Sequence, residues 1–240
     1  SNNLDEFFKV RVAGVRRMIN LKQKKVYGYD GTAEELYKDI RKVVLHQQEL
    51  FESCYLHLTQ QLINEGIYLV DEHTITPSLT KQVSQYFKET FKHMLFPIIL
   101  DKKAAFPDLR DDAIYLAIKI QKKGVANRYA ILQIPPGKAR FHVMTEGKDS
   151  FFILADDIIR LHLSNIFSML PSDKISAYTF KFTRDSELDL DDDVSQSYSE
   201  KIERSLKKRK KGTPVRFVYD EFMPEDLLVY LLNCLELKKA

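Results

Sequence analysis

The chain has 240 residues, of which 44% are hydrophobic and 30% charged, as in an ordinary soluble globular protein with one large domain or two small ones. A net charge of +3 is too small to indicate a polyanion partner by itself. Two distant cysteines, Cys54 and Cys234, exclude a disulfide framework and are interpreted as buried thiols in a reducing compartment. With no signal peptide and no apolar run long enough to cross a bilayer, we expect a cytoplasmic protein, leaving membrane association open.

Residues 1–66 are predicted to form a helical domain. Helical spacing runs from about Leu4 to Leu21, with Asn3 as N-cap. Thr32 and Glu35 then predict a capping box for a long helix that ends at Gly66. This helix carries an apolar stripe of Leu36, Ile40, Val43, Leu50, Cys54, Leu58 and Leu62. We expect a helical hairpin whose first helix is missing, because a helix starting at the third residue suggests a chain cut from something longer.

Residues 67–240 are predicted to form an α+β head domain, truncated at its end. A short strand at 67–70 precedes a helix opened by Thr76-Pro77. Alternating apolar residues predict strands near 114–120, 129–134, 178–182 and 215–219, and helices are expected at about 156–168, 192–211 and 224–237. Strand pairs interspersed with helices favour a mainly antiparallel sheet with flanking helices.

Catalytic motifs are absent from the sequence. It contains no glycine-rich nucleotide loop, no zinc-protease motif and no nucleophile elbow, and its six histidines have no partners at metal-ligand spacing. The sequence therefore predicts neither a catalytic residue nor a metal ligand in this chain.

Asn3 has two interpretations, as a helix cap or as an amide that binds a ligand. Asp5 and Glu6 in the same turn would repel a phosphate, so a neutral ligand edge fits this helix end better. An asparagine amide can pair with N6 and N7 of an adenine together.

Arg11 is predicted to point into the apolar stripe of the first helix, among Phe7, Phe8 and Val15. A buried guanidinium needs a partner, because an unpaired buried charge costs several kcal/mol. The alternatives are a salt bridge to a neighbouring domain and an anion-binding arginine in an interdomain cleft.

A change of charge marks the predicted helix at 192–211. Acidic residues from Asp185 to Asp193 precede it, and a basic run that includes Lys207, Lys208 and Arg209 closes it. A solvated helix with charges matched to its dipole explains most of this pattern. The surplus of basic residues is also compatible with a polyanion, either nucleic acid or inorganic polyphosphate. Another basic segment, Pro135 to Arg140, is interpreted as an ordinary turn between two strands.

Several segments together resemble a known family. The opening SNNLDEFFKVRVAGVRR resembles a motif of the amino-terminal domain of polyphosphate kinases that use a phosphohistidine. FKHMLFPIIL, DDAIYLAIKI, RYAILQIP, TFKFTRDSELDL and TPVRFVYDEFMP are similar to that family's head domain, in the same order. The resemblance covers essentially the whole chain.

The resemblance implies an enzyme that transfers the terminal phosphate of ATP reversibly to polyphosphate, with magnesium. It implies that Asn3 contacts ATP and that the head domain takes part in a homo-oligomer. Arg184 and Arg216 match basic positions of the family pattern, and a role for them beside polyphosphate is an extrapolation.

The family's tryptophan-bearing opening helix and its two carboxy-terminal domains are absent from this chain, which has no Trp. The family's phosphohistidine and Mg²⁺ ligands lie in those absent domains, so we expect the chain alone to be inactive. The alternative is a non-catalytic module that binds a polyanion such as nucleic acid. The absence of aromatic residues between Lys201 and Lys211 favours a partner without bases, so nucleic acid is not expected.

Overall fold

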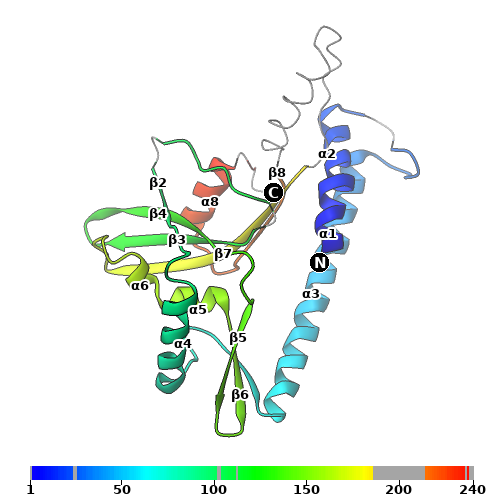
Figure 1. Cartoon of the computed structure of the whole chain (residues 1–240). Helices are drawn as coiled ribbons and strands as arrows, with labels where there is room; N and C mark the ends of the chain where they lie inside the picture. The colour runs from blue at the N-terminus through cyan, green and yellow to red at the C-terminus, as the bar shows by residue number, and fades with distance from the viewer. Residues whose placement is uncertain are drawn as a thin grey trace, which may run out of the picture.

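A computed structural model describes residues 2–23, 26–101, 104–111, 113–185, 214–235 and 237. Its amino-terminal part is helical: α1 (Asn2–Phe7), a π-helical turn η1 (Phe8–Val12) and α2 (Ala13–Asn20) form one continuous rod. The 32-residue helix α3 (Ala33–Asn64) runs back alongside this rod (Figure 1). The predicted helical hairpin is therefore present.

The predicted ends of α3 are confirmed. The Glu35 N–H donates to the Thr32 hydroxyl oxygen at 3.2 Å, and the Thr32 N–H donates to the Glu35 carboxylate at 2.8 Å, which completes the capping box. Just beyond the helix, Gly66 has a φ of 70°, a left-handed conformation that residues with a β-carbon rarely adopt.

Only the first part of α3 packs against the rod. Val44 is buried with Phe8, Val12 and Ala13, and Figure 1 shows the second half of α3 extending away from α1 and α2. Most of the predicted apolar stripe is consequently exposed, with exposed fractions of 56% for Val43, 54% for Leu50, 57% for Leu58 and 36% for Leu62. The interpretation of both cysteines as buried is also wrong, because Cys54 lies on this part of α3 and is exposed, and Cys234 is half-buried.

Two sheets form the rest of the described chain. The larger has the strand order β2 (Ile98–Leu100), β4 (Val125–Gln133), β3 (Tyr115–Lys122), β7 (Lys174–Arg184) and β8 (Pro214–Tyr219), and every pair in it is antiparallel. The smaller has the order β1 (Ile67–Val70), β6 (Asp149–Leu154) and β5 (Phe141–Glu146), with β1 and β6 parallel. The predicted α+β class with a mainly antiparallel sheet is confirmed.

Both faces of the larger sheet are covered by helices. Leu116, Ile118 and Ile120 of β3 pack with α4 (Pro77–Thr90), α5 (Ala155–Leu161) and α6 (Leu163–Ile166). The alternate residues Tyr115 and Ala117 pack against α8 (Glu225–Cys234) on the opposite face. Because successive side chains of a strand point to opposite faces of the sheet, the apolar residues of β3 pack into two hydrophobic cores, one on each face.

Some predictions of local structure need correction. The helix expected at 156–168 is divided at His162 into α5 and α6. The strands β2 and β6 were not predicted, and β5 was implied only as the strand that follows the turn at Pro135 to Arg140. β5 has a single buried residue, Met144, so its sequence lacks a clear alternation of apolar residues. The helix expected at 192–211 lies outside the described residues. In the part of the chain that the structure describes, no helix combines the length and apolar character needed to span a bilayer.

Candidate functional site

A polar cavity of about 390 Å³ lies where the helical rod meets β7. Its lining comes from α1, η1, the segment before β3, and β7, and consists of Asn3, Asp5, Glu6, Lys9, Asp111, Lys181 and Thr183. Asn3 is exposed at the rim and lies inside the first turn of α1, so it is not the residue preceding the helix that the sequence predicted. A cavity of this volume is in the range of small-ligand sites.

Asp5 holds the wall of this cavity together. One carboxylate oxygen accepts a hydrogen bond from Lys181 Nζ at 2.6 Å, and the other accepts one from Arg216 Nη1 at 2.9 Å. Burial alone would raise the pKa of Asp5, but the hydrogen bond and charge of Lys181, together with Arg216, bring this pKa below its ordinary value. The ionised carboxylate therefore joins α1 to β7 and β8.

The two arginines proposed from the family pattern lie near this cavity, each with partners inside the chain. Besides binding Asp5, the Arg216 guanidinium lies 5.0 Å from the ring centre of Phe8. Arg184 Nη1 donates to the Leu109 carbonyl at 2.7 Å and lies 3.5 Å from the carboxylate of Asp111. The structure thus brings Asn3, Arg184 and Arg216 around one region, with both arginine charges compensated by carboxylates.

The expected burial of Arg11 is wrong, because its side chain is exposed. The apolar face of the rod is centred on Phe8, Val12 and Ala13, which are 6%, 0% and 1% exposed. Arg11 lies in the π-helical turn η1, in which each residue rotates about the helix axis by a smaller angle than in the regular α-helix assumed from the sequence. The Arg11 side chain therefore points in a different direction from the predicted one. An exposed guanidinium needs no buried partner.

The basic residues Lys207, Lys208 and Arg209 lie outside the described residues, as does most of the acidic run before them. Asp185, at the start of that run, forms an ion pair with Arg17 of α2. The turn from Pro135 to Arg140 connects β4 to β5 as predicted.

The six histidines are dispersed over the fold. Among the described residues no group of three or more His, Cys, Asp or Glu side chains is arranged to hold a metal ion. The most buried histidine, His162, is 5% exposed and stacks on Phe87 with ring centres 4.0 Å apart.

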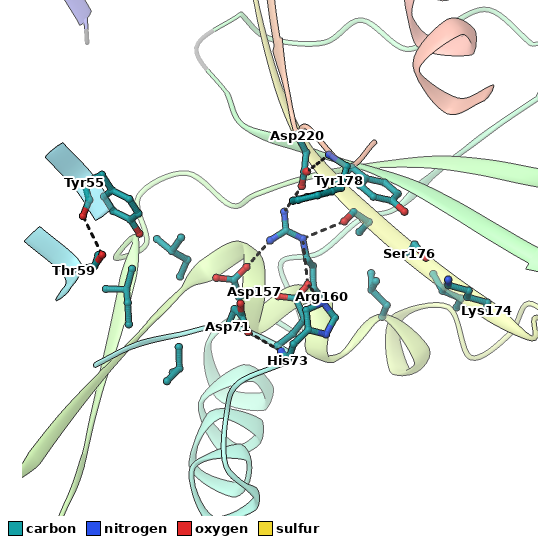
Figure 2. Close-up of a pocket in the computed structure, with 18 of the residues that line it drawn as sticks. Tyr55, Thr59, Asp71, His73, Asp157, Arg160, Lys174, Ser176, Tyr178 and Asp220 are labelled. Carbon is teal, nitrogen blue, oxygen red and sulfur yellow. Dashed lines mark hydrogen bonds and ion pairs between the residues drawn. The ribbon is translucent and has the colours of Figure 1, made fainter. Parts of the chain in front are cut away.

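A larger cavity, of about 940 Å³, is lined by none of the predicted site residues. It lies between the second half of α3, which contributes Tyr55 and Thr59, and the head domain (Figure 2). At its centre Arg160 forms an ion pair with Asp157, donates to the Thr179 hydroxyl, and lies 3.7 Å from Asp220. These contacts tie α5 to β7 and to the end of β8.

Within this cluster, the carboxyl group of Asp157 has a strongly shifted pKa. Burial, reinforced by the neighbouring charge of Asp156, raises its pKa to about 7 despite the opposing effect of Arg160. Perturbed carboxyl groups occur at active sites and also in structural ion-pair networks. Because Arg160 joins Asp157, Thr179 and Asp220 from three elements, we interpret this cluster as a structural ion-pair network.

Sequence reasoning missed both Asp5 and Arg160. Asp5 was considered only as a charge that repels phosphate, because its partners Lys181 and Arg216 are 176 and 211 residues away. For Arg160 the local signal was available, since Asp157 precedes it by one helical turn. Its other partners are distant in sequence.

The arrangement defines a class of protein: a helical hairpin fixed by a buried carboxylate to an α+β head with a mainly antiparallel sheet. The family model of the polyphosphate kinase N-terminal domain matches residues 1–70, and that of the polyphosphate kinase middle domain matches residues 79–240. This chain therefore belongs to the polyphosphate kinase family.

Curated relatives and a solved structure agree with this assignment. The chain is 34% identical to a polyphosphate kinase of Vibrio vulnificus strain YJ016 over 244 residues, which are 99% of this chain and 34% of the relative. It is 34% identical to that of Escherichia coli strain K12 over 245 residues, covering 100% of this chain and 35% of the relative. The crystal structure of polyphosphate kinase from Porphyromonas gingivalis superimposes with a TM-score of 0.74 at 25% identity, over 99% of this chain and 32% of that one. The chain thus spans about a third of the length of the curated relatives it matches.

Proposed function

We propose that this chain works as the nucleotide-contacting and assembly part of a polyphosphate kinase. In this proposal the whole enzyme transfers the terminal phosphate of ATP reversibly to inorganic polyphosphate through a phosphohistidine. The chain supplies a contact to ATP and surfaces for a homo-oligomer, and the nucleophilic histidine lies outside residues 1–240. The proposal rests on the family assignment and on the cavity beside Asn3.

The cavity suits the base of a nucleotide better than its phosphates. Three carboxylates line it, from Asp5, Glu6 and Asp111, against the two ammonium groups of Lys9 and Lys181. Because Arg216 pairs with Asp5 and Arg184 lies beside Asp111, these charges largely compensate one another. The lining therefore lacks the uncompensated positive charge that would favour phosphate, whereas a neutral base edge is compatible with it. The Asn3 amide offers an N–H donor for N7 of adenine and a carbonyl oxygen that accepts from N6.

Mg²⁺ is proposed for the whole enzyme, and the described residues do not form a site that fits it. Magnesium prefers a near-octahedral set of oxygen ligands, usually a few carboxylates with phosphate and water, and the described carboxylates that line this cavity do not group in that way. We therefore assign no metal ligand to this part of the chain and derive no step through the ion.

The test is to substitute Asn3 in a protein that carries this chain together with the remaining length of its relatives. Asn3→Ala should weaken ATP use by about 1–3 kcal/mol in kcat/KM, the range for losing hydrogen bonds to a bound ligand. Asn3→Asp keeps an acceptor oxygen but loses the amide donor, so it should be similarly impaired. Asn20→Ala, an exposed asparagine at the end of α2, is the matched control and should have wild-type kinetics.

Melting temperatures of the four proteins separate a local stability effect from a ligand contact. An Asn3→Asp protein that uses ATP as efficiently as the unaltered one would contradict the contact. The same conclusion would follow if Asn3→Ala lowered the melting temperature and left kcat/KM unchanged.

A further inference from the structure

A third, smaller cleft lies at the turn between β4 and β5, and the proposed ATP contact does not involve it. Its volume is about 170 Å³. One side is formed by the turn itself and the other by the segment before β3, and its lining consists of Arg110, Ala113, Ile114, Gln133, Ile134, Pro135, Pro136, Gly137, Lys138, Ala139, Arg140 and Ala155. We call it the turn cleft.

The charged residues that line the turn cleft are all basic. Arg110, Lys138 and Arg140 contribute to its lining, and no carboxylate does. Lys138 is exposed, and its ammonium group meets no acceptor among the described residues. A small concave surface with cations from three positions in the sequence concentrates positive potential.

Arg140 is anchored at one end and has unused hydrogen-bonding capacity. Its Nη2 donates to Asp156 at 2.9 Å. Arg140 Nη1 and Asp156 Oδ1 are both buried without a hydrogen-bond partner among the described residues, so only the exposed part of the guanidinium faces the cleft. The side chain remains 36% exposed. A guanidinium carries five N–H donors, so one hydrogen bond to Asp156 positions Arg140 without saturating it.

The backbone of the turn offers further donors. Two consecutive prolines, Pro135 and Pro136, restrict its conformation, and Gly137 follows with a φ of 77°. The N–H groups of Gly137 and Ala139 donate to no acceptor among the described residues. Exposed N–H groups in a turn that contains a left-handed residue are a common element of anion sites.

We propose that the turn cleft is a subsite for one tetrahedral phosphoryl group. Its volume is below the range of about 300–1,000 Å³ typical of sites for larger ligands, so it admits a small ion or the end of a chain rather than a nucleoside. Lys138 supplies a mobile point charge, Arg140 a fixed fork, and the turn supplies N–H donors. Inorganic phosphate and the terminal unit of a longer phosphate chain present the same chemistry to it.

The experiment is an NMR titration of the folded 240-residue chain at constant ionic strength. Inorganic phosphate and tripolyphosphate are added in separate series, with chloride as the reference anion, and the amide signals of Gly137 and Ala139 are followed. Both phosphate compounds should give saturable shifts of these signals. Equal affinities would indicate the free ion as the ligand, and tighter binding of tripolyphosphate would indicate a chain end.

Matched variants show whether the basic side chains are responsible. Lys138→Gln should weaken phosphate binding about three- to tenfold, as expected for the loss of one charge-assisted contact. Lys148→Gln changes an exposed lysine at the turn between β5 and β6 and should leave the affinity unchanged. Arg140→Lys keeps a positive charge beside Asp156 but loses the planar guanidinium with its several N–H donors. This variant should also bind phosphate more weakly.

The proposals for the turn cleft and for the ATP contact of Asn3 can be refuted independently of each other. Asn3→Ala should leave the Gly137 and Ala139 shifts unchanged, because Asn3 does not line the turn cleft. The subsite is refuted if neither phosphate compound gives saturable shifts at Gly137, or if Lys138→Gln and Lys148→Gln reduce the affinity equally.

Discussion

At the residue scale, His162 shows how burial determines the protonation state of a side chain in this head domain. Its Nδ1–H donates to the Ile158 carbonyl at 2.8 Å, because a carbonyl can only accept. Its Nε2 is then the acceptor for the Ser84 hydroxyl at 3.1 Å. Burial lowers the pKa of His162 below its ordinary value of 6.5, although the hydrogen bond to Ile158 opposes this effect. The folded protein therefore favours the neutral ring.

This state predicts a specific dependence of stability on pH. Because the pKa of His162 is lower in the folded than in the unfolded chain, its contribution is fully present above pH 6.5 and is lost as the pH falls toward the folded value. One such group changes the free energy of unfolding by at most about 1.4 kcal/mol per pH unit. Denaturant titrations between pH 7 and about pH 5 should show a smaller decrease for His162→Gln than for the unaltered protein.

The comparison isolates His162 from other titrating groups. The pKa of Asp157 is raised to about 7, so its contribution to the free energy of unfolding changes with pH in the opposite direction and decreases as the pH rises. The pH profile of the unaltered protein is the sum of both contributions. His57→Gln, at an exposed position of α3, is the control and should alter the profile less than His162→Gln does. Identical profiles for His162→Gln and the unaltered protein would be incompatible with a buried neutral His162.

At the scale of elements, the junction between the helical rod and the larger sheet depends on Asp5. The side chains of Asp5 and Arg216 are 12% and 14% exposed, so their hydrogen bond is largely shielded from water. Removing one partner of such a pair leaves the remaining charges uncompensated. Asp5→Asn leaves Lys181 and Arg216 beside each other without a counter-charge.

We therefore expect Asp5→Asn to lower the free energy of unfolding by about 2–3 kcal/mol, somewhat less than for a fully buried pair because Lys181 is 33% exposed. Glu6→Gln makes the same change of charge one residue away at an exposed position and should have an effect within about 0.5 kcal/mol. Urea denaturation measures both. Equal losses in the two variants would mean that Asp5 contributes only to the overall charge of α1.

The elements also show what could be predicted from sequence. The capping box of Thr32 and Glu35, Gly66 and the alternation in β3 are local signals, and they identified α3 and the centre of the larger sheet. Arg11 was misplaced because periodicity assumes a regular helix, whereas η1 is π-helical. The partners of Asp5, and those of Arg160 other than Asp157, could not be predicted because they depend on how strands far apart in sequence pair in the sheet. The role of Asn3 as an ATP contact was predicted from the family motif and stays a prediction, and the cavity beside Asn3 is visible only in the fold.

At the scale of the whole molecule, the chain has a long helix, α3, whose second half is partly uncovered. Phe51 and Leu56 of α3 are 72% and 67% exposed, and the 940 Å³ cavity lies alongside this half of the helix. Exposed apolar side chains on successive turns are typical of a surface that another part of a protein covers. This agrees with the proposal that the chain works within a longer, oligomeric enzyme.

The central claim is that residues 1–240 contact the nucleotide and do not carry the phosphorylated histidine. The most direct test is incubation with ATP labelled at its terminal phosphate, in the presence of Mg²⁺, followed by mapping of the acid-labile label. The folded 240-residue chain should remain unlabelled, because a phosphoryl relay requires an activated nucleophile and our proposal places the nucleophilic histidine outside residues 1–240. A protein that carries this chain and the remaining length of its relatives should acquire the label on a peptide outside residues 1–240. Stoichiometric label on any of the six histidines of this chain would contradict the account.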